Sequence, residues 1–277
     1  LALFRGTAAA QQGDLPLAHQ YYQAAVDSDP NYARAYIARG QIVFLQARQG
    51  CKAGQTDVTA ILNDALNDYS TALDLPAGPP AAISTKVNLH RGTAYLCLAM
   101  AGAGSEYWEL AKQHLDNVLR DYGDGKNPAL QYLAAQAHDR LGVRAMSLWS
   151  SGLQAAADTT PALGDPALLN EAAAAFERAV ALSRVPRELA LTHLWLALIG
   201  AVQQDCQSAR THEQDAQAAF EQAAALDSTS PAFVQWRDGW NQLYAQVMPA
   251  LTFYCPAAGA APTGLSQNPW RQRANGT

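Results

Sequence analysis

The stretch AAVDSDPNYARAYIARG, residues 24–40, joins two alanine-rich runs through the turn signal Asp29-Pro30. Both runs have helical spacing, and proline ends or begins a helix because it lacks a backbone N–H. The second run contains a glycine, Gly40, inside its helical pattern, where glycine costs about 1 kcal/mol relative to alanine. The stretch therefore predicts a helix–turn–helix unit, and the internal glycine indicates a close approach by a neighbouring helix.

The packing pattern at this junction recurs along the chain. Alanine, three residues, a Phe or Tyr, two residues and a second alanine occur together repeatedly, each time before a turn cluster. The copies are Ala18-Tyr22-Ala25, Ala65-Tyr69-Ala72, Ala172-Phe176-Ala179 and Ala216-Phe220-Ala223, with Ala111-Leu115-Val118 as a degenerate copy. Residues spaced by four and three share a helix face, where small side chains admit a second helix and the ring fills the remaining space. The chain is therefore expected to be an array of repeated units.

Strand signals are scarce, so the predicted fold class is all-α. Helices are expected in pairs over 2–12 and 15–28, 32–48 and 57–75, 80–101 and 106–121, 128–156 and 166–183, and 186–204 and 209–227, with a last helix near 231–248. This last helix carries Trp236, Trp240 and Tyr244 at i, i+4 and i+8, a stripe expected to cover the open end of the array; a partner-binding groove is the alternative. One helical domain over 1–255 and an extended tail over 256–277 are predicted.

Composition limits the classes of function. The 277 residues carry a formal charge of -5 and a pI near 5.6, so no broad positive field favours nucleic acid or an anionic membrane. The longest apolar candidate, residues 189–202, is too short to span a bilayer. Nucleic-acid binding and membrane insertion are therefore not expected, and the oligomeric state is left open.

The four cysteines, Cys51, Cys97, Cys206 and Cys255, form no CxxC pair. This spacing argues against a zinc site or a thioredoxin-like redox site. Cys206 and Cys255 flank the last helices, where a bridge would pin the C-terminal end; four buried reduced cysteines in a cytoplasmic protein are the alternative. We favour an oxidising, extracytoplasmic setting.

No enzyme motif is present. The sequence lacks a GxSxG elbow, a Walker loop, a GxGxxG fingerprint and an HExxH pair, and the carboxylates of Asp14, Asp27 and Asp29 lie at expected helix ends, where capping explains them. The six histidines, at 19, 90, 114, 138, 193 and 212, include no i, i+4 pair, so each is expected to be structural or at the surface. The chain is predicted to be non-enzymatic, with no cofactor and no metal site.

One recurring signature is more specific than the fold class. Arg-Gly pairs occur at 5–6, 39–40 and 91–92, and Gly6 and Gly40 are 34 residues apart. Together with Ala18, Tyr22, Ala25, Pro30 and Tyr36, these glycines resemble the tetratricopeptide repeat (TPR), over roughly residues 1–247. The resemblance implies a right-handed α-α superhelical solenoid of about five repeats plus a C-terminal capping helix. The chain departs from the family by insertions between the paired helices, at 49–58, 101–108 and 157–166.

The resemblance also implies a function, because TPR arrays bind extended peptides or helices along the groove formed by the first helix of each pair. Counted from the glycines, the candidate groove residues are Arg34, Ile37, Gln41, Phe44, Lys86, Leu89, Thr93 and Leu96, with Arg140 in the fourth repeat. Leu3 and Thr7 occupy the positions of the family's peptide-carboxylate clamp, which argues against that activity. The predicted function is a scaffold that binds a peptide or protein partner; the alternative is a structural or sensor segment of a larger signalling protein.

Overall fold

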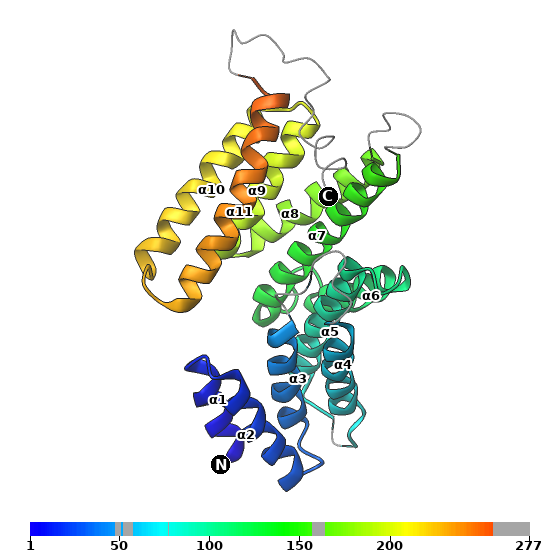
Figure 1. Cartoon of the computed structure of the whole chain (residues 1–277). Coiled ribbons are helices and arrows are strands. Elements are labelled where there is room, and N and C mark those ends of the chain that lie inside the picture. The colour runs from blue at the N-terminus through cyan, green and yellow to red at the C-terminus, as the bar shows by residue number, and fades with distance from the viewer. Residues whose placement is uncertain (48–50, 52–57, 77, 157–163, 257–277) are drawn as a thin grey trace. The chain divides into compact units, whose positions relative to one another are not determined.

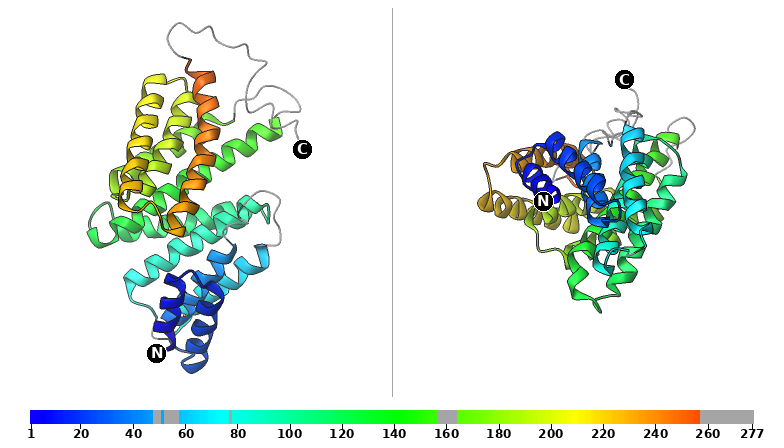
Figure 2. Two further views of the ribbon diagram at one scale, coloured as in Figure 1. Left: turned by 60° about the vertical axis from the view of Figure 1, so that its left-hand side comes forward. Right: turned by 90° about the horizontal axis from the view of Figure 1, so that it is seen from below.

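The computed structural model describes residues 1–47, 51, 58–76, 78–156 and 164–256 (Figure 1). Over these ranges every regular element is helical: eleven α-helices and one 3-10 turn, with no β-strand. Figure 2 shows the same helices from two further directions. The all-α prediction is therefore confirmed.

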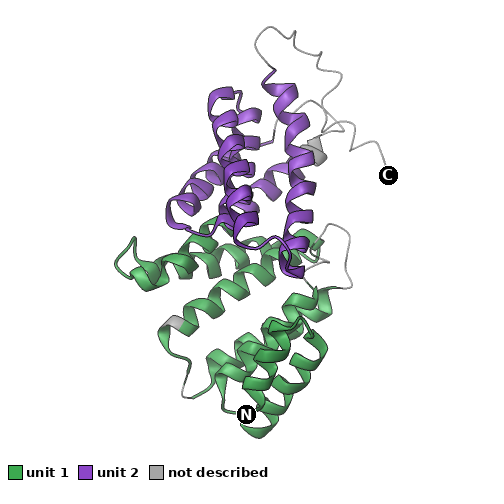
Figure 3. Cartoon of the chain, turned by 90° about the vertical axis from the view of Figure 1, so that its left-hand side faces the viewer, with its two compact units in different colours: residues 1–140 green, residues 141–277 purple. Residues whose placement is uncertain are grey.

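The chain forms two compact units, residues 1–140 and 141–277 (Figure 3). The boundary falls inside one helix, α7 (Gln131–Ala156), and each unit is described by itself. The single domain over 1–255 stays a prediction. The predicted tail lies outside the described residues except for Pro256.

The first unit is a succession of helices that each pack on the next. Its helices are α1 (Ala2–Gln11), α2 (Leu15–Ser28), α3 (Ala33–Ala47), α4 (Val58–Asp74), α5 (Ala81–Ala101) and α6 (Glu106–Tyr122), followed by η2 (Pro128–Leu130) and the start of α7. The closest pairs are α1 with α2, α3 with α4, and α5 with α6, while α2 packs on α3 and α4 on α5. The unit is therefore built of three consecutive helical hairpins, and we call α1, α3 and α5 their first helices.

The recurring glycines lie where the two helices of a hairpin meet. A methyl group on Gly6 would stand 2.5 Å from the Tyr22 ring. The corresponding distance at Gly92 is 2.8 Å to the side chain of Leu115, the residue that replaces the ring in the degenerate copy. Real side-chain carbons do not approach this closely, so only glycine fits. The predicted close approach is confirmed.

The side chain of Arg39 joins two successive hairpins of the first unit through an ion pair and a hydrogen bond. Arg39 of α3 donates through Nε and Nη2 to the two carboxylate oxygens of Asp68 on α4, at 2.9 and 2.5 Å. Its Nη1 donates to Gln23 Oε1 on α2 at 2.6 Å. The bidentate geometry satisfies the guanidinium, which burial would otherwise destabilise. Three helices are thereby joined through one side chain.

The second unit contains the rest of α7 with α8 (Pro166–Leu182), α9 (Pro186–Val202), α10 (Cys206–Leu226) and α11 (Pro231–Tyr254). It contains the same kind of close glycine contact, because a methyl group on Gly142 of α7 would stand 2.6 Å from the Phe176 ring of α8. Helices α9 and α10 form the closest pair, and α11 lies along them (Figure 2). The core includes Phe176, Leu194, Ala197 and Val247, all fully buried.

The aromatic stripe of α11 packs on α10. The ring centroids of Trp240 and Phe220 are 4.3 Å apart, those of Trp236 and Phe220 5.5 Å, and those of Trp240 and Tyr244 4.8 Å. The Tyr244 hydroxyl donates to the Glu213 carboxylate at 3.2 Å. The stripe therefore covers the preceding helix rather than lying open as a groove.

Three helix ends differ by three residues or more from the sequence-based prediction. Helix α7 begins at Gln131 rather than 128, because Pro128–Leu130 form the 3-10 turn η2. Helix α10 begins at Cys206, three residues before the expected 209, because Asp205 caps it by accepting from the Ser208 N–H at 3.1 Å. Helix α11 continues through Pro249 to Tyr254 rather than ending near 248. Ala250 and Leu251 are buried on this last turn, and their burial offsets the backbone bond that Pro249 cannot make.

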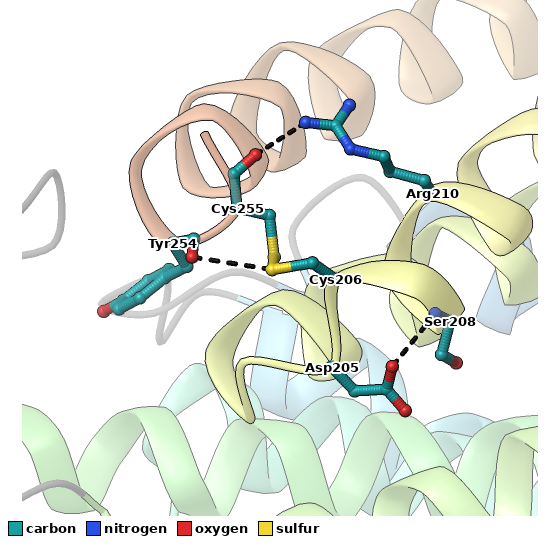
Figure 4. Close-up of a disulfide and its surroundings, with 6 residues drawn as sticks. All are labelled: Asp205, Cys206, Ser208, Arg210, Tyr254 and Cys255. Atoms are coloured by element: carbon teal, nitrogen blue, oxygen red, sulfur yellow. Dashed lines mark hydrogen bonds between the residues drawn. A yellow bond between two sulfur atoms is a disulfide. The ribbon is translucent and has the colours of Figure 1, made fainter. Parts of the chain in front are cut away.

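All four cysteines are paired. The Cys206–Cys255 bridge, expected from the sequence, joins the start of α10 to the end of α11, with Cα atoms 5.3 Å apart (Figure 4). Beside it, Arg210 Nη2 donates to the Cys255 carbonyl at 2.6 Å. The Cys51–Cys97 bridge, which the sequence did not indicate, ties residue 51 to α5 with Cα atoms 4.9 Å apart. The two pairs are compatible with the oxidising setting that the sequence analysis favoured over four reduced cysteines.

The predicted insertions fall partly outside the described residues. Of 49–58 only Cys51 and Val58 are described, and of 157–166 only the residues from Gly164 onward. Half of the third insertion, 101–108, lies in helices, because the loop between α5 and α6 is 102–105. Gly102 ends α5 with a left-handed backbone, φ 83°, which favours glycine.

Candidate functional site

Among the predicted groove residues on α3, the polar side chains are accessible to solvent and the apolar ones are buried. Arg34 is exposed and Gln41 is half-buried, whereas Ile37 and Phe44 are each only 8% exposed. Both apolar side chains belong to the hydrophobic core of the first unit. They stabilise the packing of α3 and leave its polar residues as the accessible part of the predicted site.

The same division holds on α5. Lys86 is exposed and Thr93 is half-buried, with its hydroxyl donating to the Leu89 carbonyl at 2.8 Å. Leu89 and Leu96 are buried, at 5% and 3% exposure. The accessible predicted residues of the two helices are thus Arg34, Gln41, Lys86 and Thr93, which we call the cationic face.

The cations of this face occupy equivalent positions. Arg34 precedes Gly40 by six residues, and Lys86 precedes Gly92 by six, where both glycines contact the second helix of their own hairpin. Within the described part of the chain no carboxylate pairs with either side chain, in contrast to Arg39 and Lys112. Two exposed charges without an internal partner are available to an external one.

Arg140 does not lie six residues before the glycine of its helix, as Arg34 and Lys86 do. It precedes Gly142 by only two residues, and Gln136 holds the position equivalent to Arg34 and Lys86. Its Nη1 donates to the Asp139 carboxylate at 2.5 Å, so its charge is already paired. The structure therefore separates Arg140 from the cationic face.

His90, one of the histidines expected to be structural or at the surface, lies one turn after Lys86 on the same side of α5. Its ring stacks on Tyr69 with centroids 5.7 Å apart, and its buried Nε2 has no hydrogen-bond partner among the described residues. Burial lowers the pKa of His90 to about 4, and the Lys86 ammonium acts in the same direction. The i, i+4 spacing to Lys86 is the signal that could have revealed it. His90 is a neutral polar group beside the exposed cation.

A second cluster of polar side chains lies in the second unit. Nδ1 of His193, on α9, is 3.1 Å from Nδ1 of His212, on α10. Asp215 follows His212 by three residues, and one ligand atom from each of the three side chains lies within 4.8 Å of the other two. We call these residues the His–His–Asp cluster. Among the residues that the structure describes, these three have the donor set of a metal site. The sequence analysis expected no metal site, because it found no i, i+4 histidine pair.

The carboxylates around this cluster oppose the effect of burial on the pKa values of its two histidines. Burial lowers the pKa of His193, the adjacent His212 acts in the same direction, and Asp215 acts against it. Burial also lowers the pKa of His212, against the carboxylates of Asp215, Glu177 and Asp205. Burial therefore favours the neutral form of both imidazoles, and the surrounding carboxylates favour the charged form.

The described helices include none that is long and apolar enough to cross a membrane. No family model matches the chain, and no curated protein matches it significantly.

Proposed function

We propose that the chain is a TPR-like interaction scaffold that binds an extended peptide segment of a partner protein along the cationic face. The observation that carries this proposal is the pair of exposed cations, Arg34 and Lys86, at equivalent positions of two successive first helices. Because neither has an internal partner among the described residues, both are available to a ligand.

The repeat architecture supports the comparison with TPR arrays. Three consecutive hairpins of the first unit pack in chain order, and each has a glycine of its first helix against the second helix. Such arrays present equivalent positions at regular intervals, so a ligand that is itself periodic matches them best. An extended chain, with one backbone carbonyl per residue, is such a ligand.

The residues of the cationic face determine which chemical groups of a peptide can bind to it. Arg34 and Lys86 donate to carbonyl oxygens or carboxylates, while Gln41 and Thr93 provide side-chain oxygens that accept backbone N–H groups. The buried apolar residues of α3 and α5 fix these side chains on rigid helices, which lowers the entropy lost on binding. The expected ligand is an extended segment that presents its backbone carbonyl groups, or acidic side chains, to the two cations.

The disulfides support an extracytoplasmic setting for this scaffold. Two bridges that pair all four cysteines are typical of proteins folded in an oxidising compartment. The partner is then expected in that same compartment.

The test begins with peptides selected on the purified chain from a random display library. Fluorescence polarisation then measures the affinity of a selected peptide for the unmodified chain and for Arg34→Glu/Lys86→Glu. Reversing two charges in contact with the peptide is expected to weaken binding by at least about tenfold. The control is Lys112→Glu/Arg120→Glu, which makes the same change of net charge on α6, a second helix of the same unit.

The control variant is expected to bind like the unmodified chain. Equal affinity of Arg34→Glu/Lys86→Glu and the unmodified chain for every selected peptide would contradict the proposal. So would equal weakening in both variants, because it would show a long-range effect of net charge rather than contact at the face.

A further inference from the structure

The His–His–Asp cluster has the geometry of a metal site that is independent of the cationic face. His193 and His212 come from the two helices of the closest pair in the second unit, and Asp215 lies one turn after His212. Residues three apart share a helix face, so His212 and Asp215 both face the same side of α10. Two facing helices thus contribute three donor atoms to one place, as in metal sites built between the helices of bundles.

The distance between the histidine nitrogens suits two ligands of one ion. A zinc ion binds imidazole nitrogen at about 2.0–2.1 Å, so two ligands in tetrahedral geometry are about 3.3 Å apart. The two Nδ1 atoms are 3.1 Å apart. At this separation their lone pairs cannot face each other unaided: either a proton on one ring or a cation must lie between them.

The carboxylates around the two rings favour a bound cation. The carboxylates of Glu177, on α8, and Asp205, at the start of α10, act on His212 in addition to Asp215. A divalent ion at the cluster would therefore have the carboxylates of Asp215, Glu177 and Asp205 near it.

We propose that His193, His212 and Asp215 bind a divalent transition-metal ion, with Zn²⁺ as the best match to the two nitrogens and one oxygen. Three protein ligands leave a fourth position open for water or for a group from another molecule. Asp215 is exposed and His212 is half-buried, so the open position is accessible to solvent. The ion would join α9 to α10 and increase the stability of the second unit.

The test uses the full chain after chelator treatment and removal of any histidine tag. Calorimetric titration with ZnCl₂ is expected to show one saturable site per chain, and bound Zn²⁺ is expected to raise the unfolding temperature. Asp215→Asn, at an exposed position, is expected to weaken binding by at least about tenfold, and His212→Gln by more. In ¹⁵N spectra of the imidazoles, Zn²⁺ is expected to shift Nδ1 of His193 and His212.

Two matched variants control for non-specific binding. Glu221→Gln removes one exposed carboxylate from the same helix as Asp215, and His19→Gln removes one histidine from the first unit. Both are expected to bind Zn²⁺ as the unmodified chain does. Unfolding curves without metal are expected to coincide for the unmodified chain and Asp215→Asn, so that lost binding reflects a lost ligand.

Three results would overturn the proposal. The first is the absence of saturable Zn²⁺ binding, which would show that a proton alone bridges the two imidazoles. The second is equal affinity in Asp215→Asn, His212→Gln and the controls. The third is bound Zn²⁺ with unshifted Nδ1 resonances of His193 and His212, which would place the ion elsewhere.

Discussion

Gly40 lies against the ring of Tyr69 so closely that a methyl group on Gly40 would stand 2.9 Å from Cε1 of the ring. The same methyl would stand 3.1 Å from the carbonyl oxygen of Ala65. The ring is fully buried, and the carbonyl belongs to the backbone of α4, so neither can move away easily. This contact determines how closely α3 packs on α4, and therefore the shape of the hairpin that presents Arg34.

Gly40→Ala is accordingly expected to destabilise the chain. Overpacking of this kind costs about 1–3 kcal/mol, which exceeds the gain of up to about 1 kcal/mol from the better helix propensity of alanine. Urea unfolding measures the difference. Gly239→Ala, in α11, is the control, because a methyl there would meet nothing within 4 Å. It is expected to be neutral or stabilising, and destabilisation by both changes alike would contradict this view of Gly40.

Asp68→Asn is expected to destabilise the first unit by about 3 kcal/mol, because it leaves the Arg39 guanidinium half-buried without its counter-charge. The hydrogen bond and charge of Asp68 raise the pKa of Arg39 in the unmodified chain. Arginine keeps its charge without them because its ordinary pKa is already very high, so the variant leaves a charge without its partner. The double variant Arg39→Met/Asp68→Leu removes both charges and is expected to be closer in stability to the unmodified chain. A double variant as unstable as Asp68→Asn would contradict this explanation.

Reduction of the disulfides is expected to lower stability in both units. The bridges close separations of 46 and 49 residues, for which the chain-entropy model gives about 4 kcal/mol each, at the upper end of the typical range of about 2–4 kcal/mol. Thermal unfolding with and without a reductant measures the total. Cys206→Ala/Cys255→Ala isolates the second bridge and is expected to increase amide exchange over 250–254, the turn beyond Pro249. Unchanged exchange there would show that burial alone holds the turn.

Acid is expected to destabilise the first unit through His90 and His114. Burial lowers the pKa of each to about 4, from 6.5, with Lys86 acting on His90 and Arg91 on His114 in the same direction. Because the folded pKa lies below the unfolded one, the stabilising contribution is complete above pH 6.5 and is lost as the pH falls towards 4. At pH 5 each histidine is expected to cost on the order of 1–2 kcal/mol relative to pH 7.

His90→Phe tests this pH dependence because phenylalanine can stack on Tyr69 without titrating. The loss of stability between pH 7 and pH 5 is expected to shrink in His90→Phe and to persist in His19→Gln. Urea unfolding at the two pH values provides the comparison. An unchanged loss in His90→Phe would show that other groups cause the acid sensitivity.

Local patterns explain what the sequence predicted well. Each expected helix is present, and most ends agree within a residue or two, since they depend on Pro, Gly and Asp residues that act within one turn. Asp14, for example, accepts from the Leu17 N–H at 3.0 Å, as its expected capping position implies. The glycine–ring contacts were predictable for the same reason, because their spacing repeats.

Contacts between distant residues explain what the sequence did not predict. His193 and His212 are 19 residues apart on facing helices, and no periodic pattern encodes their meeting. Cys51 and Cys97 are 46 residues apart, with a complete helix between them. The burial of Ile37 and Phe44 likewise depends on side chains of α4 and α5, so a register counted along α3 could not separate groove residues from core residues.

The central claim, that a peptide binds along the first helices of the hairpins, is tested most directly by amide hydrogen exchange with and without a selected peptide. Binding to the cationic face is expected to slow exchange in α3, 33–47, and in α5, 81–101, where Arg34 and Lys86 lie. Exchange in α4 and α6 is expected to change little, and Arg34→Glu/Lys86→Glu is expected to abolish the protection. Protection confined to α4 and α6, or to the second unit, would contradict the claim.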